Sequence, residues 1–279
     1  MQNPKIVFFD IDDTIYRKYT DTLRPSIGEA MRALKRRGIL TAIATGRPPA
    51  AVPASLGVSV DSPDAAVPAK VRRLIAETGI DMLVTINGQY TEFRGKALQA
   101  YPMTETEMAD MAAFFDSKGI AYAFVNNNEI AVSEATEWAV ETLQHILPEF
   151  LTDREYFRKK PVYQMLAFFQ TARDAELADK IAAAGLKTVR WHQNAVDMLR
   201  ADGSKACGIA RAVAELGIDM KDVMAFGDGP NDVEMLQTVG FGVAMDNGDA
   251  AAKAVADYIC PSVDEDGVFQ GLKTLGVIA

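Results

Sequence analysis

The chain has 279 residues, which is enough for one large domain or two ordinary ones. Apolar residues make up 49% and charged residues 24%, as in globular proteins, so intrinsic disorder, collagen and a disulfide scaffold are excluded as descriptions of the whole chain. The net charge of −9 argues against a nucleic-acid partner, because such a protein needs an excess of Lys and Arg. A small anionic substrate in a locally positive pocket is compatible with this charge.

The cysteines and the apolar runs favour a cytoplasmic protein. Cys207 and Cys260 are too few for a disulfide framework, and neither lies in a CxxC motif, which favours a reducing compartment. The first residues show no cationic segment followed by a long apolar one, and no apolar run approaches the roughly 20 residues of a membrane helix. We therefore expect no membrane partner, and either a monomer or a homodimer.

Residues 1–86 alternate between predicted strands and helices. The predicted strands, from short apolar runs, are 6–9, 40–45 and 82–86. Apolar residues at helical spacing predict a helix from Ile27 that ends before Gly38, and a second helix is expected at about 66–78. The Pro- and Ala-rich stretch 48–65 shows no regular pattern. This alternation is typical of a parallel, doubly wound α/β sheet.

Two helix–strand–strand units follow Asn87-Gly88. Thr104 and Glu107 form a capping box that opens the first helix, and Thr171 with Asp174 opens the second. The strands expected after these helices are 120–126, 129–133, 187–192 and 195–199. We interpret residues 87–199 as an inserted α+β domain with an antiparallel sheet, hinged at Asn87-Gly88 and at about 199–203.

The first pattern returns after Gly203. The predicted helices are 204–216, 230–238 and 249–256, and the predicted strands are 223–226, 241–245 and 258–260. The sequence therefore predicts a Rossmann-like, doubly wound parallel core sheet formed by residues 1–86 and 200–279, which the inserted domain interrupts.

Polar residues cluster where predicted core strands end. The segments are Asp10–Thr14, Thr45–Arg47 and Asp228–Asp232. Parallel sheets bind ligands at the carboxyl ends of their strands, so we expect these segments to converge. Asp10 and Asp12 are two residues apart, which on an extended strand places both carboxylates on one face. With Asp228 they form a set of hard oxygen ligands suited to Mg²⁺, and the scarcity of His argues against zinc.

Lys205 lies at the start of a predicted helix, where the helix dipole disfavours a cation. A bound anion would reverse this, because the helix end and the ammonium would both attract it. Thr45 and Gly46 offer a hydroxyl and backbone N–H groups at a strand-to-helix turn. A phosphoryl group between Mg²⁺ and these donors would balance the charges, although each residue taken alone is compatible with an ordinary cap or a solvated lysine.

These segments resemble the motifs of the haloacid dehalogenase-like phosphotransferase superfamily, and they come in its order. The matches are Asp10-Ile11-Asp12-Asp13-Thr14 to the DxDxT nucleophile motif, Thr45 to the second motif, Lys205 to the third and Gly227–Asp232 to the fourth. The place of the insertion and the segment Asp264–Val268 resemble the Cof-type branch with an α+β cap. Two departures are Asp13, where many members have Gly, and the length of the stretch 48–65.

The resemblance implies a Mg²⁺-dependent phosphatase that hydrolyses small phosphorylated metabolites, such as sugar phosphates or nucleotides, through an aspartyl-phosphate. It implies Asp10 as the nucleophile and Asp12 as the general acid and base. The implied metal site comprises Asp10, Asp12 through its carbonyl, Asp228 and, in support, Asp232. The implied phosphate-binding residues are Thr45, Gly46, Arg47, Lys205 and Asn231. The cap would exclude water and contact the leaving group, and the candidate contacts, otherwise ordinary strand residues, are Arg190, Trp191 and His192.

Two other classes of protein stay open from the sequence. A phospho-aspartate signalling module also combines Mg²⁺, acids, a Thr and a Lys on a doubly wound sheet, but such modules are usually small and have no cap. A catalytically silent binding protein would be favoured if a key acid were missing, and none is. Sustained phosphate release from a panel of sugar phosphates and nucleotides would separate the three.

Overall fold

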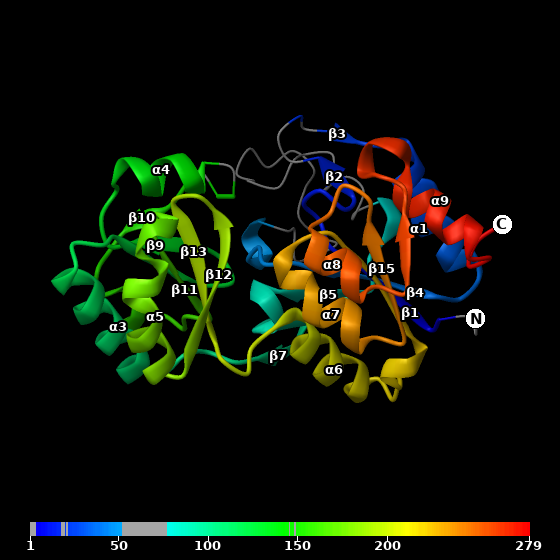
Figure 1. Ribbon diagram of the computed structural model, residues 1–279. Helices are drawn as coiled ribbons and strands as arrows, with labels where there is room; N and C mark the ends of the chain where they lie inside the picture. Colours follow the sequence, from blue (N-terminus) through cyan, green and yellow to red (C-terminus); the bar gives the residue numbers. More distant parts are fainter. Residues whose placement is uncertain (1–3, 18–19, 21, 52–76, 145, 148) are drawn as a thin grey trace.

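The computed structural model describes residues 4–17, 20, 22–51, 77–144, 146–147 and 149–279. Two bodies lie side by side in Figure 1, and both ends of the chain lie on the larger one. The larger body, here called the core, contains an eight-stranded sheet and its helices. The smaller body, here called the cap, contains a six-stranded sheet and its helices.

The core sheet has the strand order β16-β15-β14-β1-β4-β5-β6-β7. Its parallel strands are β1 (Ile6–Phe9), β4 (Leu40–Ala44), β5 (Met82–Thr85), β14 (Val223–Gly227), β15 (Phe241–Met245) and β16 (Tyr258–Cys260). Two strands, β6 (Tyr90–Phe93) and β7 (Lys96–Ala100), continue the sheet in antiparallel fashion. In the strand register, Ile6 of β1 is paired with Leu40 of β4 on one side and with Val223 of β14 on the other. The predicted α/β class with a large parallel sheet is confirmed.

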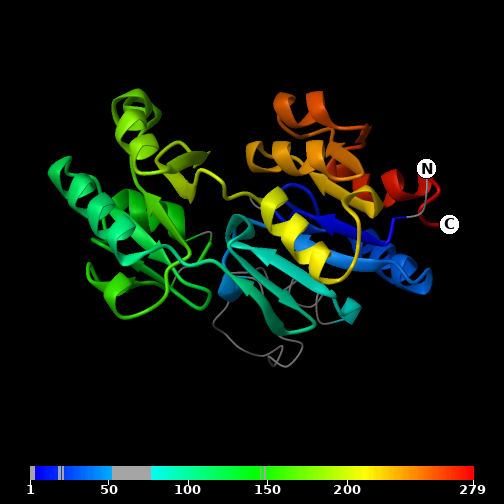
Figure 2. The same ribbon diagram turned by 90° about the horizontal axis from the view of Figure 1, so that it is seen from below.

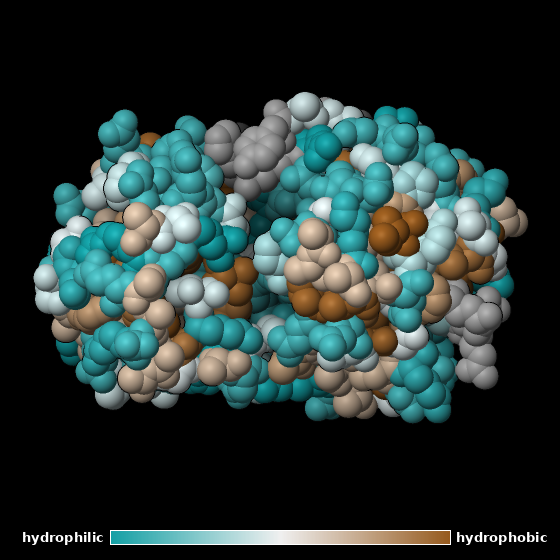
Figure 3. Space-filling model, viewed as in Figure 1, coloured by the Kyte–Doolittle hydropathy of each residue, from teal (hydrophilic) through white to brown (hydrophobic). Residues whose placement is uncertain are grey.

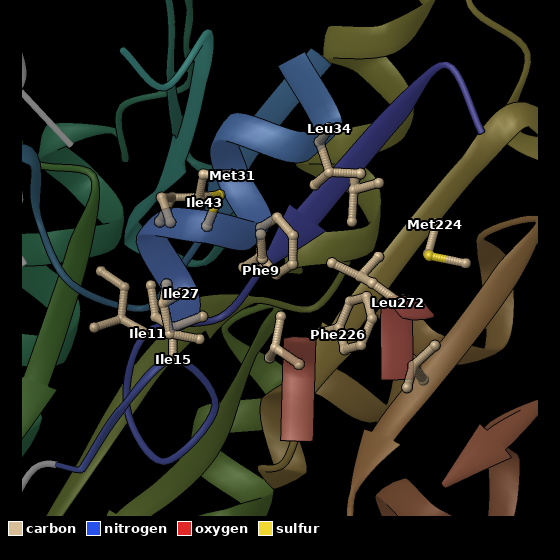
Figure 4. Packing of buried hydrophobic residues seen from close by; sticks show 14 of the residues in the cluster. Phe9, Ile11, Ile15, Ile27, Met31, Leu34, Ile43, Met224, Phe226 and Leu272 are labelled. Atoms are coloured by element: carbon tan, nitrogen blue, oxygen red, sulfur yellow. The ribbon is translucent and has the colours of Figure 1, made fainter. Parts of the chain in front are cut away.

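Helices cover both faces of the core sheet because its central strands are apolar on both sides. The core helices are α1 (Pro25–Arg36), α6 (Lys205–Glu215), α7 (Val233–Thr238), α8 (Ala250–Val255) and α9 (Gly267–Thr274). Val7 and Phe9 pack against α1 and α9, and Phe9 stacks on Phe226 with ring centroids 5.4 Å apart (Figure 4). Ile6 and Phe8 pack on the opposite face, with side chains of α6, α7 and α8.

The cap sheet has the strand order β10-β9-β8-β11-β13-β12. Its strands are β8 (Tyr122–Val125), β9 (Ile130–Val132), β10 (Leu151–Thr152), β11 (Gln164–Ala167), β12 (Leu186–His192) and β13 (Ala195–Arg200). Its helices are α3 (Glu105–Ser117), α4 (Glu137–Leu143) and α5 (Asp174–Ala183). Apolar residues of α3 and α5 pack on one face of the sheet, whereas the cluster on the other face includes Ile86 and Tyr90 of the core. The pairing is antiparallel, as expected, except between β9 and β10.

The structure moves the first predicted domain boundary. The sequence interpretation assigns residues 87–199 to the cap, whereas β6 pairs with core strand β5 and β7 pairs with β6, and Figure 2 shows these cyan strands on the core side. The chain crosses to the cap at residues 101–104 and returns at 201–204, so the hinge predicted at Asn87-Gly88 lies inside the core. The sequence analysis expects no strand at 90–93 or 96–100, so it assigns neither segment to the core sheet.

Local signals predict one helix start in the cap and fail at another. The N–H of Thr104 donates to Glu107 Oε2 at 2.6 Å, and the N–H of Glu107 donates to Thr104 Oγ1 at 3.2 Å, which confirms the capping box. Helix α5 follows a 3₁₀ turn (Thr171–Arg173), and no side chain accepts a hydrogen bond from the N–H groups at its start. The capping interaction between Thr171 and Asp174 that the sequence predicts is therefore wrong. The helix predicted at 66–78 and the stretch 48–65 fall mostly outside the described residues.

Candidate active site

The residues that follow three neighbouring core strands face one cavity. Asp10 follows β1, Thr45 follows β4 and Asp228 follows β14, and these strands are adjacent in the sheet. The cavity has a volume of about 220 Å³ and is lined by residues of both the core and the cap, where Figure 3 shows a hollow between the two bodies. The convergence expected from the sequence therefore occurs at the boundary between core and cap.

A buried ammonium group joins two carboxylates beneath this cavity. Lys205, the first residue of α6, is 1% exposed, and its Nζ lies 2.7 Å from both Asp10 Oδ1 and Asp232 Oδ1. Asp232 Oδ2 accepts hydrogen bonds from the N–H groups of Asp228 and Gly229, at 3.0 and 2.9 Å. Both carboxylate oxygens of Asp232 therefore accept hydrogen bonds, and Asp232 fixes Lys205 and the start of the loop that carries Asp228.

The acidic cluster is short of positive charge. Burial raises the pKa of Asp10 to about 7 against the opposing effect of Lys205. Burial and the charge of Asp10 raise the pKa of Asp228 to about 8, although Thr14 Oγ1 donates to Asp228 Oδ1 at 2.7 Å. Burial alone would lower the pKa of Lys205, but its two carboxylate neighbours raise it above the ordinary value. Burial therefore disfavours the ionised form of the two carboxyl groups, whereas the ammonium of Lys205 stays charged.

The cluster fits a divalent cation. One carboxylate oxygen from each of Asp10, Asp228 and Asp232 lies within 4.8 Å of the others. When all three are ionised, they carry three negative charges against the single positive charge of Lys205. A hard cation with oxygen ligands, such as Mg²⁺, would supply the missing positive charge.

Asp12 lies apart from the acidic cluster. Arg47, which is 5% exposed, donates from Nε and Nη2 to the two carboxylate oxygens of Asp12, both at 2.8 Å. The carboxylate of Asp12, expected to share a metal site with Asp10, is therefore not part of the acidic cluster found among the described residues. Because β1 ends at Phe9, neither acid lies on the extended strand. Arg47, expected to bind phosphate, is held against Asp12, and both line the cavity.

The turn after β4 is tightly packed. The hydroxyl of Thr45 accepts from the N–H of Arg47 at 3.2 Å, and Thr45 is 1% exposed. A Cβ atom added to Gly46 would lie 3.2 Å from the side-chain amide of Asn87 and 3.5 Å from Asp197. Gly46 therefore leaves room for two polar side chains beside the cavity.

The loop after Asp10 is held by a residue from the other end of the chain. Asp13 has φ +59°, a left-handed conformation that Asp tolerates better than most residues. Asn247 Nδ2 donates to the carbonyl of Asp13 at 2.9 Å, and Asn247 Oδ1 accepts from the N–H of Val263 at 2.8 Å. Asn247 was not predicted, because it belongs to none of the motifs.

The segment Asp264–Val268 braces the same loop. Arg17 bridges Asp13 and Asp264, with distances of 2.9 and 2.7 Å. Asp266 accepts from Arg24 Nε at 2.6 Å. The segment that resembles the Cof-type branch therefore contacts the chain just downstream of the predicted nucleophile.

The cap contributes an apolar wall with a few polar groups. Its apolar lining includes Val125, Ile130, Leu166 and Val189. Of the predicted substrate contacts, Arg190 and Trp191 line the cavity, whereas His192 is not part of its lining. Arg190 forms an ion pair with Asp174 and donates to the carbonyl of Phe169 at 3.0 Å, so it also holds the cap together.

The sequence analysis missed the role of three buried polar residues: Gln164 and Asp197, which line the cavity, and Asn87, which contacts both of them. Gln164 and Asp197 come from cap strands β11 and β13, and both hydrogen-bond to the side chain of Asn87. The sequence interpretation treats Asn87 as a hinge, and a lone Gln or Asp within a strand gives no signal of a site. Asn231, which was predicted, donates to Asn87 Oδ1 at 3.1 Å.

The family model of the haloacid dehalogenase-like hydrolases matches residues 7–62 and 67–272. The chain therefore belongs to the haloacid dehalogenase-like hydrolases, in the Cof-type branch that its motifs predicted. Among these hydrolases it is a phosphatase, as its relatives indicate.

Two relatives and one solved structure support the assignment as a phosphatase. A Bacillus subtilis protein named as a phosphatase, YkrA, is 30% identical over 278 residues, 98% of each chain. A Streptococcus pyogenes protein named as a bifunctional phosphatase and peptidyl-prolyl cis-trans isomerase is 32% identical over 98% of this chain, which spans 54% of that protein. The structure of a sugar phosphatase of haloacid dehalogenase subclass IIB matches with a TM-score of 0.83 and 30% identity, over 98% of this chain and 100% of that one.

Among the helices in the described part of the chain, none combines the length and apolar character needed to cross a membrane.

Proposed function

We propose that the protein is a Mg²⁺-dependent phosphatase that hydrolyses small phosphorylated metabolites through an aspartyl-phosphate on Asp10. The observation that carries this proposal is the separation of two carboxylates beside one cavity. Asp10 is buried against Lys205, whereas Asp12 is held apart by Arg47. Two carboxyl groups in different surroundings can perform different tasks, here nucleophilic attack and proton transfer.

In the first step, a carboxylate oxygen of Asp10 attacks phosphorus, and the bond between phosphorus and the leaving oxygen breaks. The leaving oxygen takes a proton from the carboxyl group of Asp12 and departs as an alcohol. Lys205, Thr45 and Asn231 bind the phosphoryl oxygens and stabilise the charge that builds up on them. Lys205 also orients the nucleophile, since its Nζ lies 2.7 Å from Asp10 Oδ1.

In the second step, the carboxylate of Asp12 takes a proton from a water molecule whose oxygen attacks phosphorus. The bond between phosphorus and Asp10 breaks, which releases inorganic phosphate and restores both side chains. Arg47 donates to both oxygens of Asp12 in the structure, which orients the ionised carboxylate that acts as the base in this second step.

Asp10, Asp228 and the carbonyl of Asp12 would hold the Mg²⁺ ion, with Asp232 orienting the loop of Asp228. When bound, the ion screens the charge of the nucleophile from that of the phosphate. The closeness of the carboxylate oxygens of Asp10, Asp228 and Asp232 supports this assignment, and a cation there would offset the burial that raises the pKa of Asp10 and of Asp228.

We assign phosphoryl transfer to the core and leaving-group selection to the cap. Every residue with a proposed chemical role belongs to the core, and the apolar lining of the cavity comes from the cap except for Pro48 and Pro230. Sugar phosphates and nucleotides are the proposed substrates, and the similarity to a sugar phosphatase supports the former. The free thiols of Cys207 and Cys260 fit the cytoplasm, and we expect a monomer or a homodimer, which light scattering would distinguish.

Phosphate release from a panel of sugar phosphates, nucleotides and p-nitrophenyl phosphate tests the proposal. We expect many phosphates released per enzyme molecule by the wild type with Mg²⁺, and almost none by Asp10→Asn at matched circular dichroism. Release that stops at one phosphate per molecule would indicate a phospho-aspartate switch instead. No release from any compound would leave a binding protein as the better description.

A further inference from the structure

The side chain of Asn87 lies where the core, the loop of Asn231 and the cap meet. Asn87 is 1% exposed, and its Oδ1 accepts from Asn231 Nδ2 at 3.1 Å. Its Nδ2 donates to Gln164 Oε1 at 3.0 Å and to Asp197 Oδ2 at 2.7 Å. One amide group therefore joins a proposed phosphate-binding residue of the core to two neighbouring strands of the cap.

The core fixes the position of Asn87. Its N–H donates to the carbonyl of Thr45 at 3.1 Å, and the preceding N–H, of Ile86, donates to the carbonyl of Arg47 at 3.0 Å. Ile86, Asn87 and Gly88 all have positive φ, at 51°, 49° and 88°, and this conformation is rare for a β-branched residue such as Ile. Such conformations persist where the surroundings enforce them, and they cluster at functional sites.

The direction of the Asn87 amide is decided by the cap. An ionised carboxylate accepts hydrogen bonds and cannot donate them, so Asp197 requires the NH₂ group of Asn87 to point toward β13. The carbonyl oxygen of Asn87 then points to Asn231 and accepts from its NH₂ group. The NH₂ group of Asn231 has a second hydrogen, which is the donor that an anionic phosphoryl group needs.

We propose that Asn87 is a positioning residue through which Asp197 of the cap sets the amide direction of Asn231. The hydrogen-bonded series Asp197–Asn87–Asn231 is here called the amide relay. When the cap is seated, the relay presents an N–H of Asn231 to the phosphoryl group. When the cap is lifted, both amides can turn over, and Asn231 can present its carbonyl oxygen to an anion. The relay rests on the proposed phosphate-binding role of Asn231, and it couples phosphate binding to cap closure.

The relay is tested by exchanging donor and acceptor in the hydrogen bond between residues 87 and 197. In Asn87→Asp, the new carboxylate still accepts from Asn231 but faces the carboxylate of Asp197, so we expect inorganic phosphate to bind at least tenfold more weakly with Mg²⁺ present. In Asn87→Asp/Asp197→Asn, the side chain at 197 donates to the one at 87, the total charge equals that of the wild type, and phosphate affinity should recover most of the loss. Calorimetric titration with inorganic phosphate measures each affinity without requiring turnover.

Two variants control this experiment. Asn128→Asp makes the same substitution at an exposed position of the cap, and it should leave phosphate affinity unchanged. Asn87→Gly tolerates the positive φ and removes the amide altogether, so Asp197→Asn should not rescue it. Asn87→Gly also keeps the inference testable if Asn87→Asp does not fold.

The outcomes separate the relay from the proposed function. Equal phosphate affinity in all variants, or an Asn87→Asp defect that Asp197→Asn does not repair, would overturn the relay whatever the turnover. The expected pattern of affinities in a protein without sustained phosphate release would support the relay and refute catalysis. In the active enzyme, kcat/KM should follow the same loss and recovery as the affinity.

Discussion

The core and cap walls of the cavity are held in different ways. On the core wall, buried charges are fixed by each other: Lys205 by Asp10 and Asp232, and Arg47 by Asp12. On the cap wall, much of the lining is apolar, and Arg190 is engaged by its own domain. The core wall therefore holds charged groups at fixed positions, whereas the cap wall forms a mainly apolar surface against which the leaving group would pack. Changes to the core wall should alter the chemistry, and changes to the cap wall should alter which leaving group fits.

The largest effect is expected at the centre of the core wall. Asp10→Asn keeps the shape of the side chain but removes the nucleophile, so phosphate release should fall roughly 100-fold or more with every substrate. Initial rates measured at matched circular dichroism check this. A variant that keeps more than a few per cent of the activity would remove Asp10 as the nucleophile.

Removal of the divalent ion should also stop turnover, because the acidic cluster would then repel the phosphate. Exhaustive treatment with EDTA should abolish phosphate release, and added Mg²⁺ should restore it. Calcium, which prefers a larger and looser shell of oxygen ligands, serves as the comparison ion. Full activity after chelation would contradict the metal assignment.

Lys205→Met should weaken the fold as well as the activity. Removing one partner of a buried ion pair costs about 3–5 kcal/mol, because the remaining charge stays buried and uncompensated. Urea denaturation followed by circular dichroism measures the free energy of unfolding. Lys187→Met, at a partly exposed cap position 3.9 Å from Glu234, is the matched control and should cost less than about 1 kcal/mol. Equal costs would contradict the assignment of Lys205 as a buried ammonium that two carboxylates compensate.

The effect of Asp12→Ala should depend on the leaving group. A sugar alkoxide needs a proton to leave, whereas p-nitrophenolate leaves with less help. Formation of the aspartyl-phosphate in single-turnover experiments should therefore slow more with a sugar phosphate than with p-nitrophenyl phosphate. An equal loss with both substrates would assign Asp12 a role other than proton donation.

The smallest effect is expected on the cap wall. Val189 is partly buried and lines the cavity, so Val189→Ala should change the ranking of kcat/KM among sugar phosphates and nucleotides by a few-fold. Hydrolysis of p-nitrophenyl phosphate should stay near the wild-type rate. Thr188→Ala, at an exposed neighbouring position that is not part of the cavity lining, should leave the ranking unchanged. Loss of all activity in a folded Val189→Ala protein would show that the cap takes part in the chemistry.

Features that depend on one strand or one helix end could be predicted from the sequence. The apolar run Ile6–Phe9 indicated a strand buried on both faces, and the acids after it indicated a site at its carboxyl end. Lys205 stood out because a lysine is unfavourable at a helix start. The structure shows a partner that the sequence does not reveal, since the ammonium is bound by Asp10 and Asp232.

Features that depend on where an element stops, or on contacts between distant elements, could not be predicted. Side chains two residues apart share a face only on an extended strand, and no pattern shows that β1 ends before Asp10 and Asp12. Asn87 and Asn247 act through hydrogen bonds to segments far away in the sequence. Single polar residues of this kind have no periodicity, so their partners become known only from the fold.

The position of β1 between β4 and β14 has a consequence for how the protein is made. One neighbour of β1 is complete once Ala44 has left the ribosome, but the other, Val223–Gly227, follows after the whole cap. The cap is a continuous segment, so it can fold while the core sheet still lacks β14, β15 and β16, three of its eight strands. Until then, one edge of the run Ile6–Phe9 has no partner strand, and an apolar edge of this kind promotes aggregation. Slow translation of the last third of the chain would therefore prolong the stage at which the nascent protein is most prone to self-association.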